Sequence, residues 1–387
     1  MGNYEDVDGL TISVESMESR KAVLRICWVV PDLERYNKMW SMQNLFSDWS
    51  VRNDVDLTVV EYGKRNDSPL LRYLDVISKF LYVWQTSQDF LYRSIYRRKL
   101  KRELNKYNKF DVLFFPAFLN VIDEIENKGS VCLYTDTLLS EMNAYRRYKP
   151  FKHISSFFFL SNIKKDSKKI DLLFCQNEWT ARCYSLTCKV PKSKIFNVHF
   201  GVNLKLYDGD KDYLQHRMLI VLRKGKERLK GCTLLLKAMP LIREVYNDAV
   251  LDIVGTDYGA NVEGVVCHYN QPRSTTIELF KQATLYVMPS HNEPNGVTFL
   301  EGLACKAPIV GLNRYAFPEF CGYGEWGFIV EEETPECLAK TVCEAFSNPG
   351  RLYAMGINGQ KYVEENFIWS KTSERMIELM RTLTGKK

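Results

Sequence analysis

Short, continuously apolar runs alternate with longer stretches of helical period, and this alternation most constrains how the chain can fold. The runs fall into two series, at 22–30, 56–62, 111–116, 131–136, 171–176 and 195–201, then at 217–223, 251–255, 285–290, 308–312 and 327–330. Helical patterns such as 233–246 and 336–346 lie between them. Strands that are apolar on both faces and separated by helices are typical of parallel sheets covered on both sides. We therefore predict an α/β fold with two doubly wound domains.

The seam between the two domains is expected in the polar stretch 204–216, which carries turn residues. The predicted N-terminal domain covers residues 1–205, in which 1–20 form a polar extension, and the predicted C-terminal domain covers residues 206–365. A length of 387 residues is compatible with two or three domains.

Composition and charge narrow the class of protein. The net charge of +6 favours anionic ligands or surfaces without demanding nucleic acid, and no nucleic-acid-binding module is present. The eleven cysteines are scattered without a CxxC pair, which is typical of reduced thiols in the cytoplasm. The chain shows no secretory signal and no apolar run of the roughly 20 residues that span a bilayer. A cytoplasmic protein is expected, and its oligomeric state is left open.

Two strand ends in the second series carry residues suited to binding an anionic ligand. Arg223 ends one strand and opens a basic loop that includes Lys230 and leads to a helix near Gly231. The other strand end begins the stretch MPSHNEPNGVTFLEGLACKAP (288–308), in which Gly296 precedes a helix. A helix N-terminus together with two cations would hold a diphosphate.

Two glutamates lie close to this predicted diphosphate site. Glu293 is in the loop, and Glu301 is one or two turns into the helix. Neither carboxylate would bind phosphate, but both could accept hydrogen bonds from sugar hydroxyls. A diphosphate between two hydroxylated groups describes a nucleotide sugar. The alternative is that Glu301 is a solvated helix residue and that Arg223 and Lys230 are surface charges of a basic loop.

These motifs, in their order, resemble the retaining GT-B glycosyltransferases of family 4. The resemblance covers roughly residues 195–385 and rests on HFGVN (199–203), Arg223 with LKG (229–231), LDIVG (251–255), the block 285–311 with its E-x7-E spacing, and NFIWSKTSERMIELM (366–380). It implies two Rossmann-like domains that face a central cleft, with a terminal helix at 366–387 that crosses back to the N-terminal domain.

The resemblance also implies a role for each site residue. Glu293 would contact the donor sugar, Glu301 would hold the ribose hydroxyls, and Arg223 and Lys230 would neutralise the diphosphate. The backbone near Gly296 would approach the distal phosphate through the amides of Val297 and Thr298. The donor would be a UDP-, GDP- or ADP-sugar, the acceptor would be a glycan or a lipid-linked acceptor, and the anomeric configuration would be retained. No cofactor or metal is expected, because fixed cations replace the metal and the five histidines form no HExxH motif.

The chain departs from the family pattern at three places. Leu222 and Lys306 stand where glycines are usual, and VVPDLERYNKMW (29–40) replaces a Gly-Gly loop. Asp136, at the end of the run 131–136, is a candidate acceptor-side residue, and its alternative role is that of a cap or turn residue. Glu319 resembles a family glutamate that either binds substrate or stabilises a loop.

The segment 89–109 is strongly basic and carries an apolar stripe formed by Tyr92, Tyr96, Leu100, Leu104 and Tyr107. One interpretation is a helix packed on the sheet with a solvated basic face. The other is peripheral attachment to an anionic membrane surface. We expect a metal-independent hexosyltransferase of polysaccharide or glycolipid biosynthesis. The alternatives are a nucleotide-sugar hydrolase or epimerase of the same fold, and a catalytically silent subunit that only binds.

Overall fold

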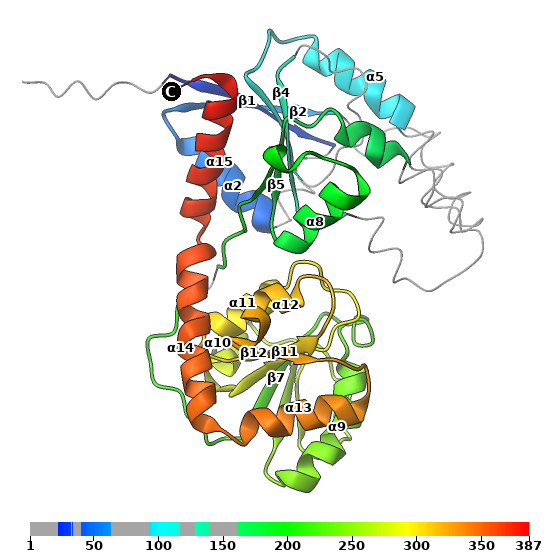
Figure 1. The fold of residues 1–387 in the computed structure, drawn as a ribbon, viewed down its shortest axis with the longest axis vertical. Coiled ribbons are helices and arrows are strands. Elements are labelled where there is room, and N and C mark those ends of the chain that lie inside the picture. Colours follow the sequence, from blue (N-terminus) through cyan, green and yellow to red (C-terminus); the bar gives the residue numbers. More distant parts are fainter. Residues whose placement is uncertain are drawn as a thin grey trace, which may run out of the picture.

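Two separate parallel sheets organise the chain (Figure 1). The structure is a computed structural model, and it describes residues 22–31, 33, 40–62, 93–116, 128–138, 161–203 and 205–386. The first sheet has the strand order β2-β1-β3-β4-β5-β6 and the second has the order β12-β11-β10-β7-β8-β9. All the paired strands run parallel. The two doubly wound sheets that the sequence predicts are therefore present.

The strands coincide with the apolar runs, with one addition. Those of the first sheet are β1 (Leu24–Val30), β2 (Val55–Glu61), β3 (Val112–Pro116), β4 (Ser130–Thr135), β5 (Leu172–Cys175) and β6 (Ile195–Asn197). Those of the second are β7 (Arg217–Val221), β8 (Val250–Val254), β9 (Val265–His268), β10 (Leu285–Val287), β11 (Ile309–Leu312) and β12 (Gly327–Val330). The addition is β9, a half-buried edge strand whose apolar signal is too short to stand out.

Several predicted boundaries are too long. The run 195–201 is a strand only to Asn197, and the run 285–290 is a strand only to Val287. In both cases the apolar residues continue into a buried loop, because loops at strand ends can also pack against the core. The predicted seam at residue 205 lies between β6 and β7, and the domain limits themselves stay a prediction.

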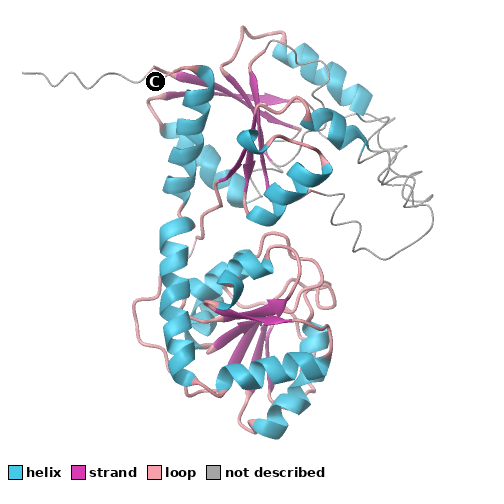
Figure 2. Cartoon of the chain, viewed as in Figure 1, coloured by secondary structure: helices cyan, strands magenta, loops and turns pink. Residues whose placement is uncertain are grey.

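Helices cover the two sheets on both faces (Figure 2). They are α2 (Trp40–Val51), α5 (Arg93–Leu104), α8 (Glu178–Thr187), α9 (Cys232–Val245), α10 (Arg273–Gln282), α11 (Val297–Ala304), α12 (Phe317–Phe320), α13 (Pro335–Phe346), α14 (Pro349–Asn366) and α15 (Trp369–Thr384), with short 3₁₀ turns η3 (Lys192–Lys194) and η4 (Gly322–Gly324). Local sequence sets several starts. Thr334 and Asn348 each accept a backbone N–H at the beginning of α13 and α14, and a proline follows each of them.

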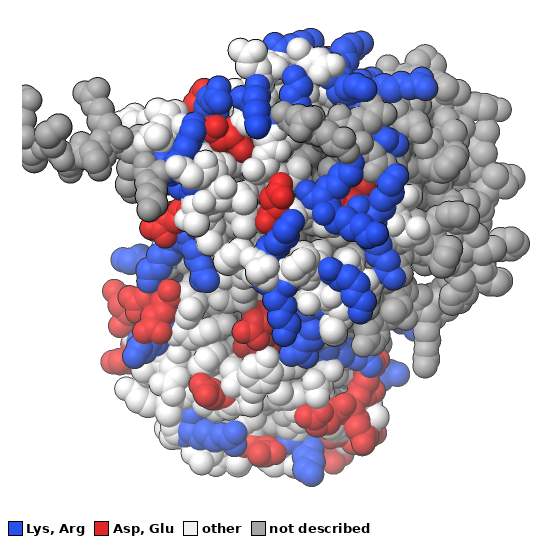
Figure 3. Space-filling model, turned by 45° about the horizontal axis from the view of Figure 1, so that its top comes forward, with Lys and Arg blue, Asp and Glu red and all other residues white. Residues whose placement is uncertain are grey.

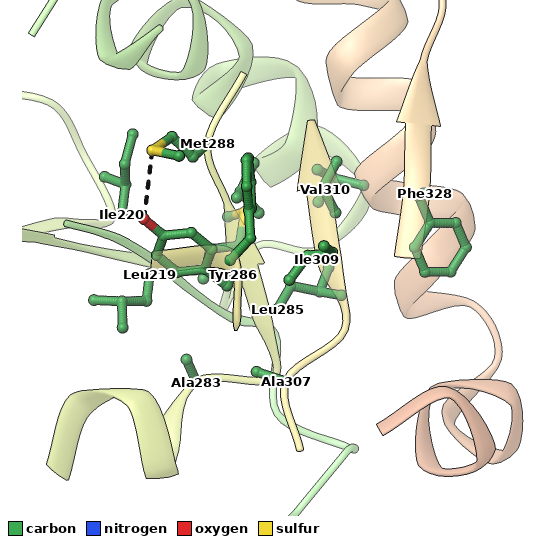
Figure 4. Packing of buried hydrophobic residues seen from close by; sticks show 14 of the residues in the cluster. Leu219, Ile220, Ala283, Leu285, Tyr286, Met288, Ala307, Ile309, Val310 and Phe328 are labelled. Carbon is green, nitrogen blue, oxygen red and sulfur yellow. Dashed lines mark hydrogen bonds between the residues drawn. The ribbon is translucent and has the colours of Figure 1, made fainter. Parts of the chain in front are cut away.

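The core of the second sheet is built from the central strands β7, β10 and β11 (Figure 4). Tyr286 is fully buried between the side chains of neighbouring strands, and its hydroxyl lies 3.5 Å from the sulfur of Met288. Full burial of a tyrosine requires a partner for its hydroxyl, and methionine supplies a weak one. Leu222, where the family pattern has glycine, places its side chain in the same core.

The last helix of the chain completes the core of the first sheet. Helices α14 and α15 follow one side of both sheets, and α15 lies beside β1 and α2 (Figure 1). Met376, Ile377 and Met380 are buried in one cluster with residues of β1 and α2. The indole of Trp49 donates to the hydroxyl of Ser373 over 2.8 Å. The helix begins at Trp369, three residues later than the motif 366–380 indicates.

Gly201 is packed directly against Trp369, where the chain passes between the two sheets. A β-carbon at Gly201 would lie 2.3 Å from Cγ of Trp369. We expect Gly201→Ala to lower the free energy of unfolding by about 1–3 kcal/mol, because overpacking displaces the start of α15. Gly350→Ala is the control, since its β-carbon meets only Asn348 Oδ1 at 3.6 Å. Urea unfolding measures both. Equal stability of the two variants would contradict the packing role of Gly201.

Candidate functional site

The candidate site lies where the strand order of the second sheet reverses. Strands β7 and β10 are neighbours there, so the loops that follow them, 222–231 and 288–296, leave the same edge of the sheet. Such a reversal is the usual place for a ligand in an open α/β sheet. The two loops are in direct contact, because the backbone N–H of His291 and the hydroxyl of Ser290 both donate to the carbonyl of Leu229, at 2.9 and 3.1 Å.

Gly231 makes this contact possible. Its φ is +77°, and an added β-carbon would lie 1.9 Å from the carbonyl oxygen of Pro289. Only glycine tolerates both the left-handed backbone and the close approach. Gly231 is also the cap residue of α9. The sequence motif LKG thus sets the distance between the two loops.

Lys230 and Glu293 form an ion pair across the two loops. The second oxygen of Glu293 accepts the backbone N–H of Gly296 over 3.1 Å. Burial, helped by the charges of Arg223 and Lys226, lowers the pKa of Lys230 to about 8, while contact with the Glu293 carboxylate favours its charged form. Arg223 is exposed and lies close enough to Lys230 to act on its charge. The structure therefore brings Arg223, Lys230 and Glu293 to one place.

The N-terminus of α11 lies beside this ion pair. Gly296 caps the helix with φ +53°, and an added β-carbon would lie 2.7 Å from the ring of Phe299. The backbone N–H groups of Val297 and Thr298 have no acceptor among the residues that the structure describes. Free N–H groups at a helix N-terminus attract an anion.

Glu301 is paired with a residue that the sequence analysis did not single out. Its carboxylate is 3% exposed and forms an ion pair with Arg273, the first residue of α10, whose side chain is 47% exposed. One guanidinium nitrogen of Arg273 lies 3.4 Å from the second carboxylate oxygen. Burial raises the pKa of Glu301, and Arg273 opposes that rise. The two residues are 28 positions apart on different helices, so no local pattern signals the pair.

Asp136 lies in the other half of the molecule, directly after β4, and is half-buried. Burial raises the pKa of its carboxyl group. Its carbonyl accepts the hydroxyl of Thr180 over 2.6 Å, and Asn177, at the start of the same helix, donates to the carbonyl of Pro294 over 2.8 Å. The carboxyl end of β4 is therefore linked through α8 to the loop that carries Glu293.

Two negative findings concern metals and membranes, and both apply only to the described part of the chain. No group of three or more His, Cys, Asp or Glu side chains there is placed to hold a metal ion. No helix there combines the length and the apolar character needed to cross a membrane. The absence of a metal requirement stays a prediction.

The basic segment 89–109 is partly described as α5. Leu100 and Leu104 are buried in the core of the first sheet, as the apolar stripe predicts. Tyr107 is 41% exposed and does not belong to the buried stripe, because the helix ends at Leu104. The part of the chain that the structure describes does not include residues 89–92, among them Tyr92, or the side chain of Tyr96. Lys and Arg side chains gather along the top of the view in Figure 3. Within the segment 89–109, the cations that the structure describes as exposed are Arg98, Lys101, Arg102, Lys106 and Lys109.

The part of the chain that carries this site matches a known family. Residues 215–362 match glycosyl transferases group 1. Among curated relatives, the lipopolysaccharide core biosynthesis mannosyltransferase of Rhizobium leguminosarum is 29% identical over 27% of this chain and 30% of its own length. A GDP-mannose-dependent phosphatidylinositol monomannoside mannosyltransferase of Mycolicibacterium smegmatis is 26% identical over 39% and 44%. The chain thus spans less than half of these relatives' length.

Solved structures extend the likeness to the whole fold. A glycosyltransferase from Rickettsia africae has a TM-score of 0.60 at 14% identity and covers 94% of this chain and 100% of its own. The sucrose-phosphate synthase of Thermosynechococcus elongatus has a TM-score of 0.63 with the same identity and the same coverage. The predicted GT-B fold is confirmed. Identities this low establish the fold alone.

The Arg273–Glu301 pair leads to a prediction on stability. Arg273→Gln leaves a buried carboxylate without its cation, and we expect a loss of about 1–3 kcal/mol at pH 8, reduced because Arg273 is half exposed. A carboxyl group with a raised pKa binds its proton more tightly in the folded state, so acidification should restore stability. Urea unfolding at pH 5 and pH 8 measures this. The control is the double variant Arg273→Gln/Glu301→Gln, which has no carboxylate at position 301. If the double variant lost as much stability as the single variant at both pH values, the loss would not come from the unpaired carboxylate.

Proposed function

We propose that this protein is a retaining glycosyltransferase of family 4 that transfers a sugar from a UDP-, GDP- or ADP-sugar to a glycan or lipid-linked acceptor. The observation that carries the proposal is the ion pair of Lys230 and Glu293 beside the free N–H groups of α11. Cations, a helix N-terminus and two carboxylates on adjacent loops match a diphosphate flanked by hydroxylated groups. The family match over residues 215–362 supports the same assignment.

In the proposed complex the diphosphate binds between Lys230, Arg223 and the N-terminus of α11. Lys230 then exchanges part of its contact with Glu293 for phosphate oxygens, and the freed carboxylate accepts hydrogen bonds from the donor sugar. Glu301 accepts from the ribose hydroxyls, and Arg273 keeps that buried carboxylate ionised. The fixed cations supply the charge that a metal would otherwise supply, so we propose that no metal is required.

Transfer then depends mostly on electrostatics. Cleavage of the bond between the sugar and the diphosphate places negative charge on the leaving oxygen, and Arg223, Lys230 and the helix N-terminus stabilise that charge. Each well-aimed group of this kind contributes about 3 kcal/mol to the transition state. The acceptor hydroxyl attacks from the face that the diphosphate leaves and gives its proton to the departing phosphate oxygen, which retains the anomeric configuration. Asp136 is the candidate residue on the acceptor side.

Buried polar atoms near Asp136 support an acceptor site at the same strand ends. The hydroxyl of Thr137 and the side-chain oxygen of Gln176 are buried and have no hydrogen-bond partner in the described part of the chain. They directly follow β4 and β5, whose carboxyl ends face the loop of Glu293 through Asn177. Unpartnered buried oxygens are uncommon in native proteins and fit the hydroxyl groups of a glycan.

The proposal predicts different kinetic defects for different residues. Lys230→Ala should lower kcat about 100-fold, because it removes a cation from the leaving group. Glu301→Ala should mainly raise the donor KM, and Glu293→Gln, which can still accept the N–H of Gly296, should mainly lower kcat. Lys237→Ala is the control, since it removes an exposed cation of α9 that lies outside both loops of the site.

Nucleoside diphosphate release from a panel of nucleotide sugars, with and without acceptor glycans, measures these effects. Release only with an acceptor supports transfer, and release without one supports the alternative hydrolase. If no UDP-, GDP- or ADP-sugar raises Tm, the silent binding subunit is correct. Wild-type rates in the Lys230, Glu293 and Glu301 variants would refute the site.

We also propose that the basic face of α5 holds the protein at an anionic membrane surface on the cytoplasmic side. The buried Leu100 and Leu104 fix the helix to the sheet, so its exposed cations point outward as a rigid set. Each cation near such a surface contributes about 1 kcal/mol. A lipid-linked acceptor would be presented at that surface.

Vesicle co-sedimentation tests the membrane proposal. Replacing Arg98, Lys101 and Arg102 with serine should weaken binding to phosphatidylglycerol vesicles by about 100-fold at low salt. The control variant replaces Lys237, Lys340 and Lys361, exposed residues of the second half, and changes the net charge equally. Binding that is indifferent to anionic lipid, to salt and to the α5 substitutions would remove the proposal.

A further inference from the structure

The start of α8 contacts the loop that carries Glu293. The side-chain oxygen of Asn177 accepts the backbone N–H of Thr180 over 2.8 Å and caps the helix, while its side-chain nitrogen donates to the carbonyl of Pro294 over 2.8 Å. Asn177 is fully buried. One side chain therefore both caps a helix of the first half and fixes a loop of the second half, next to Glu293.

Glu319 approaches the same helix start from the second half. Its carboxylate accepts the backbone N–H of Glu178 over 2.7 Å and that of Trp179 over 3.4 Å, and its other oxygen accepts the side-chain amide of Asn197 over 3.4 Å. The first N–H groups of a helix have no partner within the helix, and its dipole favours an anion there. Glu319 of the second half thus accepts hydrogen bonds from the first N–H groups of α8, which have no acceptor within the helix.

We propose that Asn177 and Glu319 are positioning residues, which couple the closure of the two halves to the placement of Glu293. The inference rests on the proposed function. We call the hydrogen bonds from Asn177 to Pro294 and from Glu178 and Trp179 to Glu319 the α8 contact. With the α8 contact formed, the Glu293 loop is fixed by Lys230 from its own half and by Asn177 from the other. With the halves apart, the loop keeps the contacts to its own half, Lys230 among them, but loses the one from Asn177. The donor sugar then loses its fixed position relative to the acceptor.

The α8 contact should depend on pH. Burial raises the pKa of Glu319 to about 7, and the charge of Glu178 acts in the same direction, while the N–H groups of Glu178 and Trp179 and the amide of Asn197 oppose the rise. Within the part of the chain that the structure describes, the other titratable groups whose charge interacts with this carboxyl are Cys175 on β5, Tyr323 on η4 and Tyr362 on α14. They are neutral at pH 7, so Glu319 is the group that titrates.

The sign follows from linkage. The contact also buries the Glu319 carboxyl, and burial outweighs the N–H groups that favour its charged form. We therefore infer that the pKa of Glu319 is higher with the α8 contact formed, so that the contact is strongest in acid. Raising the pH from 5.5 to 7.5 should increase the opening of the contact about 20-fold, and the effect should level off above pH 7. Glu319→Gln imitates the neutral carboxyl and should hold the contact with no pH dependence in this range.

Hydrogen exchange of the full-length protein tests the contact without any assay of transfer. Exchange of the peptide 176–182, corrected for the intrinsic rate, should rise with pH in the wild type and remain level in Glu319→Gln. The same rise in both proteins would show that another group titrates and would overturn the pH claim. Glu319→Ala should raise exchange of this peptide at every pH.

Kinetics test the positioning role. Asn177→Asp keeps the acceptor for Thr180 but loses the donor to Pro294, so kcat should fall at least ten-fold while the donor KM stays within two-fold. Asn348→Asp controls for the change of cap residue, because Asn348 caps α14 by the same kind of hydrogen bond, to the N–H of Arg351. Asn348 is exposed whereas Asn177 is buried, so urea unfolding of both variants separates a loss of stability from a loss of positioning. Wild-type kcat in Asn177→Asp would overturn the coupling. A wild-type protein that transfers no sugar would refute the proposed function instead, and the exchange experiment would still decide the α8 contact.

Discussion

The close approach of the loops after β7 and β10 is the constraint on which the rest of the site depends. It exists because the strand order reverses between these two neighbours and because Gly231 leaves room for the carbonyl of Pro289. Lys230 and Glu293 meet as a result, and the N-terminus of α11 lies beside them. The charges of Lys230 and Glu293, about 60 residues apart in sequence, thus lie in contact. Limited access of solvent strengthens their electrostatic interaction with a bound ligand.

The fold could be predicted because its strands are buried on both faces. Such strands read as continuous apolar runs, and their periodicity is visible without any knowledge of the fold. The edge strand β9 was not predicted because it is half-buried and four residues long. The ends of β6 and β10 were placed too far along the chain, since the loops that follow them are also buried.

The site was predictable only in its local parts. Gly296, Glu293 and Glu301 lie within one short stretch, so helical spacing was enough to relate them. The partners of these residues were not predictable in the same way. Arg273 meets Glu301 across 28 positions, and Glu319 meets the start of α8 across 141. Contacts of this kind depend on how helices and sheets are placed in space, and a single sequence carries no local signal for them.

One departure from the family pattern has a simple structural explanation. Lys306 lies just after α11 with φ +57°, in the left-handed conformation that favours glycine at this position. Its ammonium group donates to the carbonyl of Gly209 over 2.9 Å, which compensates for part of the backbone cost. Helix α11, which carries Glu301, therefore ends with a residue in the left-handed conformation, although that residue is lysine and not glycine.

The position of α15 also bears on how the polypeptide is made. Met376, Ile377 and Met380 belong to the core of the sheet that contains β1, so β1, which leaves the ribosome before α15, lacks part of its core until α15 has emerged. During synthesis the first sheet keeps an apolar face exposed until α15 is available. The buried core of the second sheet ends at Phe367, before α15, and can therefore form earlier. A nascent chain of this architecture should therefore complete its later half first.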